Sequence, residues 1–188
     1  MSRQPIARAN RHAKSLEPLR LHEEAEIPGL LEGVKDPLVL VLDGIQDPHN
    51  LGALLRTADC AGCCLVVVTR RNSAPITDTV RRVAVGAAEK LPIVLANNLR
   101  NALDKLKASG VWVAGTSDHK ASQSLYNAKL TGPLAVVLGA EGDGIRHLTA
   151  ETCDLLVRIP MLGTVPCLNV SVAAGVCLFE VVRQRGKR

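Results

Sequence analysis

Three short segments of the sequence combine polar side chains with turn residues in otherwise apolar surroundings. The first, DPHNLGALLRTAD, carries Asn50 and Arg56 among Leu, Ala and Gly residues. An arginine in such a setting either extends its head group into solvent or holds an anion, because guanidinium forms paired hydrogen bonds to carboxylate or phosphate oxygens. Asn50 has the alternative role of a helix N-cap. The segment therefore indicates either an anion site or an ordinary helix start.

The second segment, VVLGAEGDGI, places Gly139, Gly142 and Gly144 where a strand is predicted to pass into a helix. Glycine lets a backbone approach a ligand closely, but a tight turn would use the same residues. The spacing matches neither G-x-G-x-x-G nor the G-x-x-x-x-G-K-[ST] of a P-loop, so these nucleotide-binding fingerprints are absent. Glu141, within this cluster, is a candidate for a polar contact.

The third segment, IPMLGTVPCLNVSVAAGVCLFE, spans residues 159–180. Pro160 and Gly163 end a predicted strand, and Pro166 precedes the start of a long apolar helix. Asn169 can be the N-cap of that helix or a residue of a functional site, and the segment taken alone favours neither.

Other catalytic arrangements find little support. The five histidines lack metal-ligand spacing, and no G-x-S-x-G elbow indicates a hydrolase. Cys60 and Cys63 form a C-x-x-C without a second pair, so we interpret the six cysteines as reduced, mostly buried structural thiols and predict no metal site.

These segments must be positioned by a regular alternation of strands and helices. Continuous apolar runs predict strands at residues 37–44, 64–69, 91–96, 111–116, 134–142 and 154–160, and helices are predicted at 50–62, 78–90, 99–110, 144–153 and 168–185. Apolar strands that alternate with helices predict an α/β fold, a parallel sheet covered by helices on both faces. Ligands of such sheets bind beyond the carboxyl ends of the strands, where the three segments lie.

The 188 residues suit one domain, with residues 1–37 as a basic and polar tail or linker and 38–188 as the folded part. The formal net charge of +5 comes with clustered arginines at both ends and in TRRNSAPITDTVRR, which favours phosphate-bearing partners or a merely solvated basic surface. Only three aromatic residues are present, which argues against a base-stacking platform. No membrane span or signal peptide is evident, so we expect a cytoplasmic protein.

In order and spacing, the three segments resemble the three motifs of the SpoU branch of the SPOUT methyltransferases, over about residues 38–185. The resemblance implies an RNA ribose 2′-O-methyltransferase that uses S-adenosyl-L-methionine, a C-terminal trefoil knot and a homodimer packed through the knot region. Among the family's substrates, the resemblance favours a guanosine in the peptidyl-transferase loop of 23S rRNA. The alternatives are a tRNA substrate or a catalytically silent knotted RNA-binding module.

The resemblance also assigns roles by motif position. It implies that Arg56 and Asn50 lie at the reacting ribose, and that Glu141 and Asn169 order the site. The implied cofactor-binding residues are Gly139, Ile159, Leu168, Thr116, Gly115 and Met161.

Two departures from the family pattern stand out. Cys167 occupies a position that is usually serine, and a thiol is a weaker hydrogen-bonding group. The ribosomal-RNA members carry an N-terminal RNA-binding domain, which residues 1–37 are too short to hold.

Overall fold

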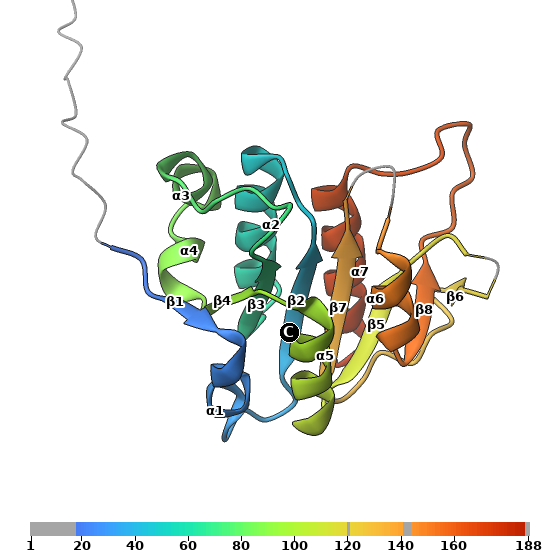
Figure 1. Ribbon diagram of the computed structural model, residues 1–188. Helices are drawn as coiled ribbons and strands as arrows, with labels where there is room; N and C mark the ends of the chain where they lie inside the picture. The colour runs from blue at the N-terminus through green and yellow to red at the C-terminus, as the bar shows by residue number, and fades with distance from the viewer. Residues whose placement is uncertain (1–17, 120, 141–143, 187–188) are drawn as a thin grey trace, which may run out of the picture.

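The apolar runs of the sequence form the strands of one parallel sheet in the computed structural model, which describes residues 18–119, 121–140 and 144–186 (Figure 1). The strand order is β1-β4-β3-β2-β7-β5-β8-β6, and every pairing between these strands is parallel. The strands are β1 (Leu21–Glu23), β2 (Leu38–Asp43), β3 (Leu65–Thr69), β4 (Ile93–Ala96), β5 (Trp112–Thr116), β6 (Gln123–Ser124), β7 (Leu134–Gly139) and β8 (Leu155–Arg158).

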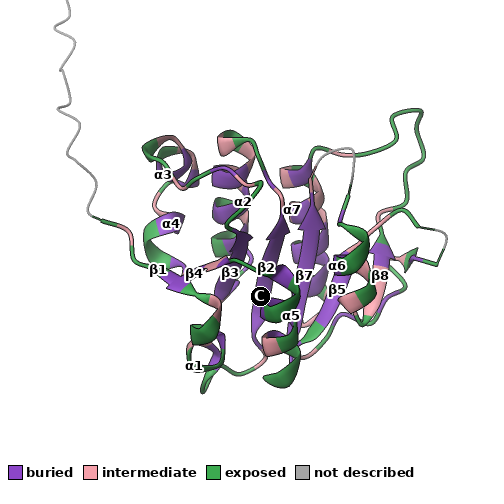
Figure 2. Ribbon diagram, in the orientation of Figure 1, coloured by how far each residue is buried: buried purple, intermediate pink, exposed green. Residues whose placement is uncertain are grey.

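Helices cover both faces of this sheet, as the sequence predicts. One face carries α2 (Pro48–Cys60), α3 (Asp78–Ala84), α4 (Ala87–Lys90) and α7 (Val170–Gln184), and the other carries η1 (Glu24–Glu26), α1 (Ile27–Leu31), α5 (Leu99–Ala108) and α6 (His147–Thr152). Along β2, Leu40 and Leu42 join the first core, whereas Val39 and Val41 join the second. This alternation follows from the two-residue period of a strand, and it explains why the central strands are apolar throughout. Figure 2 shows these strands buried between the two helical layers.

All six predicted strands are present, and two short strands were not predicted. β1 lies within the predicted N-terminal tail and pairs with β4, and β6 pairs with β8 at the opposite edge. The helix predicted over 78–90 is divided in two, because Val85 and Gly86 adopt left-handed backbone conformations with φ of 53° and 87°. A left-handed residue cannot continue a right-handed helix.

The strand order brings three loops together. β7 is inserted between β2 and β5, and β8 lies between β5 and β6. The segments that follow β5, β7 and β8 therefore leave the sheet side by side at its carboxyl end (Figure 1). The trefoil knot implied by the family resemblance stays a prediction.

Candidate active site

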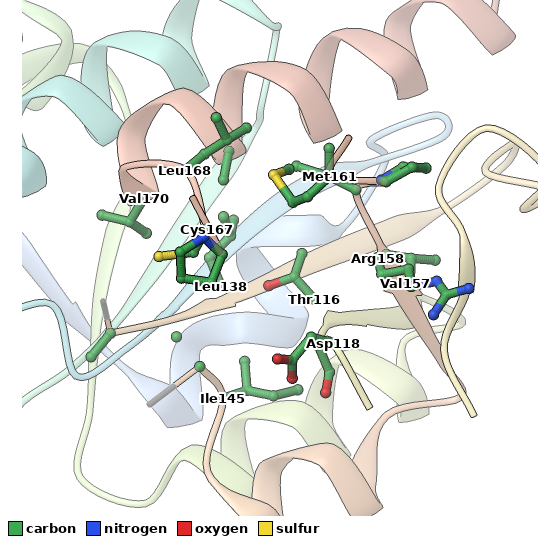
Figure 3. A pocket seen from close by; sticks show the side chains of 18 of the residues that line it. Thr116, Asp118, Leu138, Ile145, Val157, Arg158, Met161, Cys167, Leu168 and Val170 are labelled. Carbon is green, nitrogen blue, oxygen red and sulfur yellow. The ribbon is translucent and has the colours of Figure 1, made fainter. Parts of the chain in front are cut away.

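A cavity of about 600 Å³ lies beyond the carboxyl ends of β5, β7 and β8. Five of the six predicted cofactor-binding residues line it: Thr116, Gly139, Ile159, Met161 and Leu168. Figure 3 shows Met161, Cys167 and Leu168 on one side of the cavity, and Ile145 and Asp118 on the other. Segments that are more than 50 residues apart in the sequence thus form one pocket, because the parallel sheet aligns their strand ends.

Gly139 is a glycine because the chain returns directly over it. Ala140 and Gly144 form an antiparallel bridge, and the Gly144 N–H donates to the Ala140 carbonyl over 3.1 Å. A methyl group on Gly139 would overlap the carbonyl group of Gly144. The glycine therefore keeps the end of β7 open for the backbone that borders the cavity.

Gly115, the sixth predicted residue, lies outside the lining. A Cβ there would come within 2.7 Å of both Cys153 Sγ and Ile145 Cδ1. Its small size lets α6 and the preceding loop pack closely against β5, so its effect on the cavity passes through Ile145, which does line the pocket.

The cavity also contains polar residues that the sequence reasoning did not name. Ser117, Asp118, Ser124 and Arg158 line it, beside Thr116, whose hydroxyl donates to the Val137 carbonyl over 3.0 Å. Only their position could have indicated them, because each of these residues lies at the end of a strand or within two residues of it. No motif in the sequence distinguishes these four side chains from other residues of the same loops.

Asn50 and Asn169, separated by 119 positions, are brought into contact. Asp47, not Asn50, caps α2, since its carboxylate accepts from the His49 N–H over 2.9 Å. The alternative of Asn50 as a helix cap is therefore wrong. Asn50 lies within the first turn of α2, where its side-chain oxygen accepts from Asn169 Nδ2 over 3.0 Å.

Of the two roles that the sequence left open for Asn169, the structure shows the helix cap, and the role in a functional site stays a prediction. Asn169 is the N-cap of α7, and its side-chain oxygen accepts from the Ser171 N–H over 2.9 Å and from the Ser171 hydroxyl over 2.6 Å. Its neighbours Leu168 and Val170 line the cavity. The asparagine pair thus links the rim of the cavity to α2.

Arg56 lies on α2 with an exposed side chain, six residues beyond Asn50. Within the part of the chain that the structure describes, no hydrogen bond or ion pair holds its guanidinium. Glu141, the remaining predicted site residue, lies outside the described residues.

The central arginine cluster divides into two groups. Arg70 pairs with Glu23 over 2.6 Å, and the buried Arg81 pairs with Glu89 over 2.7 Å. Ion pairs thus hold Arg70 and Arg81 within the fold. Arg71 and Arg82 are exposed, and Arg82 donates to the Asp78 carbonyl and the Thr79 hydroxyl of its own helix.

All six cysteines are free thiols, but only Cys63 and Cys177 are fully buried, and burial raises the pKa of each to about 12. Cys60 and Cys167 are exposed, which corrects the prediction of mostly buried thiols. Among the described residues, no group of three or more His, Cys, Asp or Glu side chains is arranged to hold a metal ion. In the same part of the chain, no helix has the length and apolar character needed to cross a membrane.

Comparison with known proteins gives a consistent result. The model of the SpoU rRNA Methylase family matches residues 37–179. The 23S rRNA (guanosine-2'-O-)-methyltransferase RlmB of Photobacterium profundum is 51% identical over 170 residues, which are 90% of this chain and 69% of that protein.

Two crystal structures share the fold. The SpoU methyltransferase AviRb from Streptomyces viridochromogenes, in complex with AdoMet, has a TM-score of 0.77 at 27% identity, over 84% of this chain and 64% of that one. The AdoMet-bound rRNA methyltransferase from Sinorhizobium meliloti has a TM-score of 0.78 at 28% identity, over 87% of this chain and 61% of that one. This chain thus spans less than two thirds of either crystallised chain. Sequence, fold and the arrangement of the three motifs agree that the chain belongs to the SpoU rRNA Methylase family.

Proposed function

We propose that this protein transfers a methyl group from S-adenosylmethionine to a ribose 2′-hydroxyl of RNA, and that the substrate is a guanosine of 23S rRNA. The observation that carries the proposal is the cavity at the carboxyl end of the sheet, with the Asn50–Asn169 pair at its rim. The RlmB relative supports the substrate, since its name describes this reaction and it is 51% identical to this chain over 170 residues. Residues 38–188 would be the catalytic domain.

The cavity fits adenosylmethionine in size and chemistry. Its volume of about 600 Å³ lies within the range of small-molecule sites. Leu138, Ile159 and Leu168 offer apolar walls for an adenine ring, and Asp118 lies where a carboxylate could accept from a ribose hydroxyl or an ammonium group. The cofactor, when bound, supplies a methyl group activated by the positive charge of its sulfonium.

The protein's own contribution is to position and stabilise the attacking oxygen. Methyl transfer requires in-line attack, so correct placement of the ribose supplies much of the rate. Asn50 and Asn169 hold each other across two helices and present polar groups beside the cavity. A site that fixes such dipoles in advance stabilises charge without reorganising during the reaction.

Arg56 acts on the ribose as a fixed positive charge. A guanidinium is effectively always protonated, so it does not remove the hydroxyl proton itself. In our proposal Arg56 binds an RNA phosphate and stabilises the developing alkoxide, while the proton passes to water or to a phosphate oxygen. Adenosylmethionine, held by the residues of the cavity, would give up its methyl group to the alkoxide oxygen and would leave as a neutral thioether.

A second copy of the chain is the proposed partner of an exposed apolar surface. Leu162 is 99% exposed and Val165 is 68% exposed in the segment before α7, and Val172 and Phe179 are about half exposed on α7 itself. Apolar groups gathered in this way indicate an interface. A homodimer packed through α7 and the preceding segment would cover them, and it agrees with the knot-centred dimer implied by the family resemblance.

Mapping of 2′-O-methyl groups tests the proposed function. Total RNA is compared from cells that contain the gene, lack it, or carry the Arg56→Ala variant. We expect one guanosine of 23S rRNA to lose its methyl group in the last two strains. Loss of a tRNA methyl group instead would identify the alternative substrate. No change, together with no calorimetric binding of adenosylmethionine, would indicate a silent RNA-binding module.

A further inference from the structure

A second cavity, of about 440 Å³, lies beyond the carboxyl ends of β3 and β4. Its lining is strongly basic: Arg71, Arg100 and Arg146 contribute three guanidinium groups, and no Asp or Glu is among the lining residues. The remaining polar residues are Thr69, Asn72, Asn97, Asn98, His147 and Thr149. Such a set of cations and neutral hydrogen-bonding groups suits an anion.

The loop that carries Arg71 is held rigidly. The Thr69 and Ser73 hydroxyls lie 2.6 Å apart, the Gly44 N–H donates to Thr69 Oγ1 over 3.0 Å, and the Ala74 N–H donates to the Ile45 carbonyl. Asn72 turns the chain with φ of 60°, a conformation that asparagine tolerates better than most residues. Arg71 is exposed on this loop, and among the described residues no carboxylate pairs with it.

The start of α5 supplies the opposite wall. Asn98 caps this helix of ten residues and accepts from the Asn101 N–H over 3.4 Å, and Arg100 is exposed in its first turn. The first turn of a helix carries partial positive charge, which adds to that of Arg100. The arginine is therefore placed where its charge and the helix end act on the same ligand.

Arg146 connects this cavity with the proposed active site. It lies 2.6 Å from Oδ1 of Asp43, whose side chain is fully buried, and the Thr149 hydroxyl donates to Oδ2 over 2.8 Å. Gly144 and Ile145 line the first cavity, and Arg146 and His147 line the second. Consecutive residues of one anchored segment thus border both cavities.

We propose that the second cavity binds a phosphodiester of the RNA strand whose ribose is methylated at the first cavity. This inference rests on the proposed function. A strand that reaches from one cavity to the other would place a backbone phosphate among Arg71, Arg100 and the start of α5. With few aromatic side chains in the protein, such phosphate contacts fix the position of the strand without stacking on its bases.

The test compares RNA binding by two variants of equal net charge. Arg71→Ala/Arg100→Ala removes two charges from the cavity. The control, Lys35→Ala/Lys129→Ala, removes two exposed charges from segments that precede β2 and β7, at the amino ends of the strands. The probe is an unmethylated transcript of the peptidyl-transferase loop of 23S rRNA, titrated at several salt concentrations.

Each lost phosphate contact lowers the slope of log Kd against log salt by about 0.7 for a single strand, so the cavity variant, which loses its contact with one phosphate, should lose about 0.7. Its Kd at low salt should rise about tenfold or more, while the control keeps the wild-type slope within about 0.3. Adenosylmethionine affinity, measured by calorimetry, should stay within about twofold in both variants, since neither arginine lines the first cavity.

Equal slopes for the cavity variant and the control would overturn the proposal. So would a cavity variant that loses adenosylmethionine affinity as strongly as RNA affinity, because that outcome assigns the arginines to the structure of the first site. The proposed function is tested by a different measurement, and it is refuted if the wild-type protein methylates no RNA. The salt slopes are direct binding measurements, so they still decide the role of the second cavity in that case.

Discussion

Replacement of Asn169 by alanine or by serine separates its role as a helix cap from the role that we propose for it in the active site. Alanine can do neither. Serine is as good an N-cap as asparagine, but its side chain is too short to reach Asn50. The two variants therefore differ in capping and share the loss of the contact with Asn50.

The expected stability changes follow from these contacts. Loss of the cap to the Ser171 N–H costs about 1 kcal/mol. The exposed hydrogen bond to Asn50 contributes about 0.5 kcal/mol, at the low end for neutral groups. The alanine variant should lose about 1.5 kcal/mol, or roughly 3–6 °C in Tm, and the serine variant should lose roughly 1–2 °C.

The rate of methyl transfer should fall equally in the two variants, although their stabilities differ. Both variants lose the asparagine contact at the rim of the cavity, so we expect each to lose about tenfold or more in kcat, measured with tritiated adenosylmethionine and the 23S rRNA transcript at a temperature where both are folded. A serine variant with wild-type kcat would refute the reasoning, because Asn169 would then act only as a helix cap. An alanine variant with wild-type Tm would contradict the capping estimate instead.

Three further predictions concern individual side chains. Arg56→Ala should bind adenosylmethionine with unchanged calorimetric affinity but transfer no methyl group; retained turnover would exclude Arg56 from the reaction. Iodoacetamide should modify the exposed Cys60 and Cys167 but spare Cys63 and Cys177, whose pKa is raised to about 12, and adenosylmethionine should slow the reaction of Cys167 alone, since it lines the cavity. Equal protection of Cys60 would argue against the cavity as the cofactor site. Hydrogen bonds from Arg183 and then Gln184 lower the pKa of the buried Glu180 from 4.5 to about 2, against the effect of its burial, so its stabilisation is complete above pH 4.5 and lost as the pH falls toward 2. Glu180→Gln should therefore show a shallower fall of Tm over that range than the wild type, and an equally steep fall would contradict this role.

The fold could be predicted from the sequence as far as local patterns determine it. Each buried strand is a continuous apolar run, and each run is bounded by turn residues. β1 and β6 escaped prediction because they contain three and two residues, too few for a period to show. The order of the strands could not be predicted either, since β2, β3 and β7 have similar apolar sequences and would pair equally well in several arrangements.

The site shows the same division. Residues of the second and third motifs line the cavity beyond the carboxyl ends of β7 and β8, because parallel strands end at a common edge, whereas no residue of the first motif lines it. Residue types could not decide whether Asp47 or Asn50 is the N-cap of α2, since aspartate and asparagine are both good N-cap residues. Asp43 is not among the predicted site residues, because its partner Arg146 lies 103 positions away and no local pattern joins them.

The insertion of β7 between β2 and β5 constrains how the protein is made. The strand partners of β5 are β7 and β8, and both are synthesised after it. A nascent chain that has just completed β5 can therefore assemble β2, β3 and β4, but β5 must wait for its neighbours to leave the ribosome. The cavity depends on residues as late as Ala173, so cofactor can begin to assist folding only after the start of α7 has left the ribosome. Translation would thus deliver the two halves of the sheet in sequence, with cofactor binding possible only after the second half is in place.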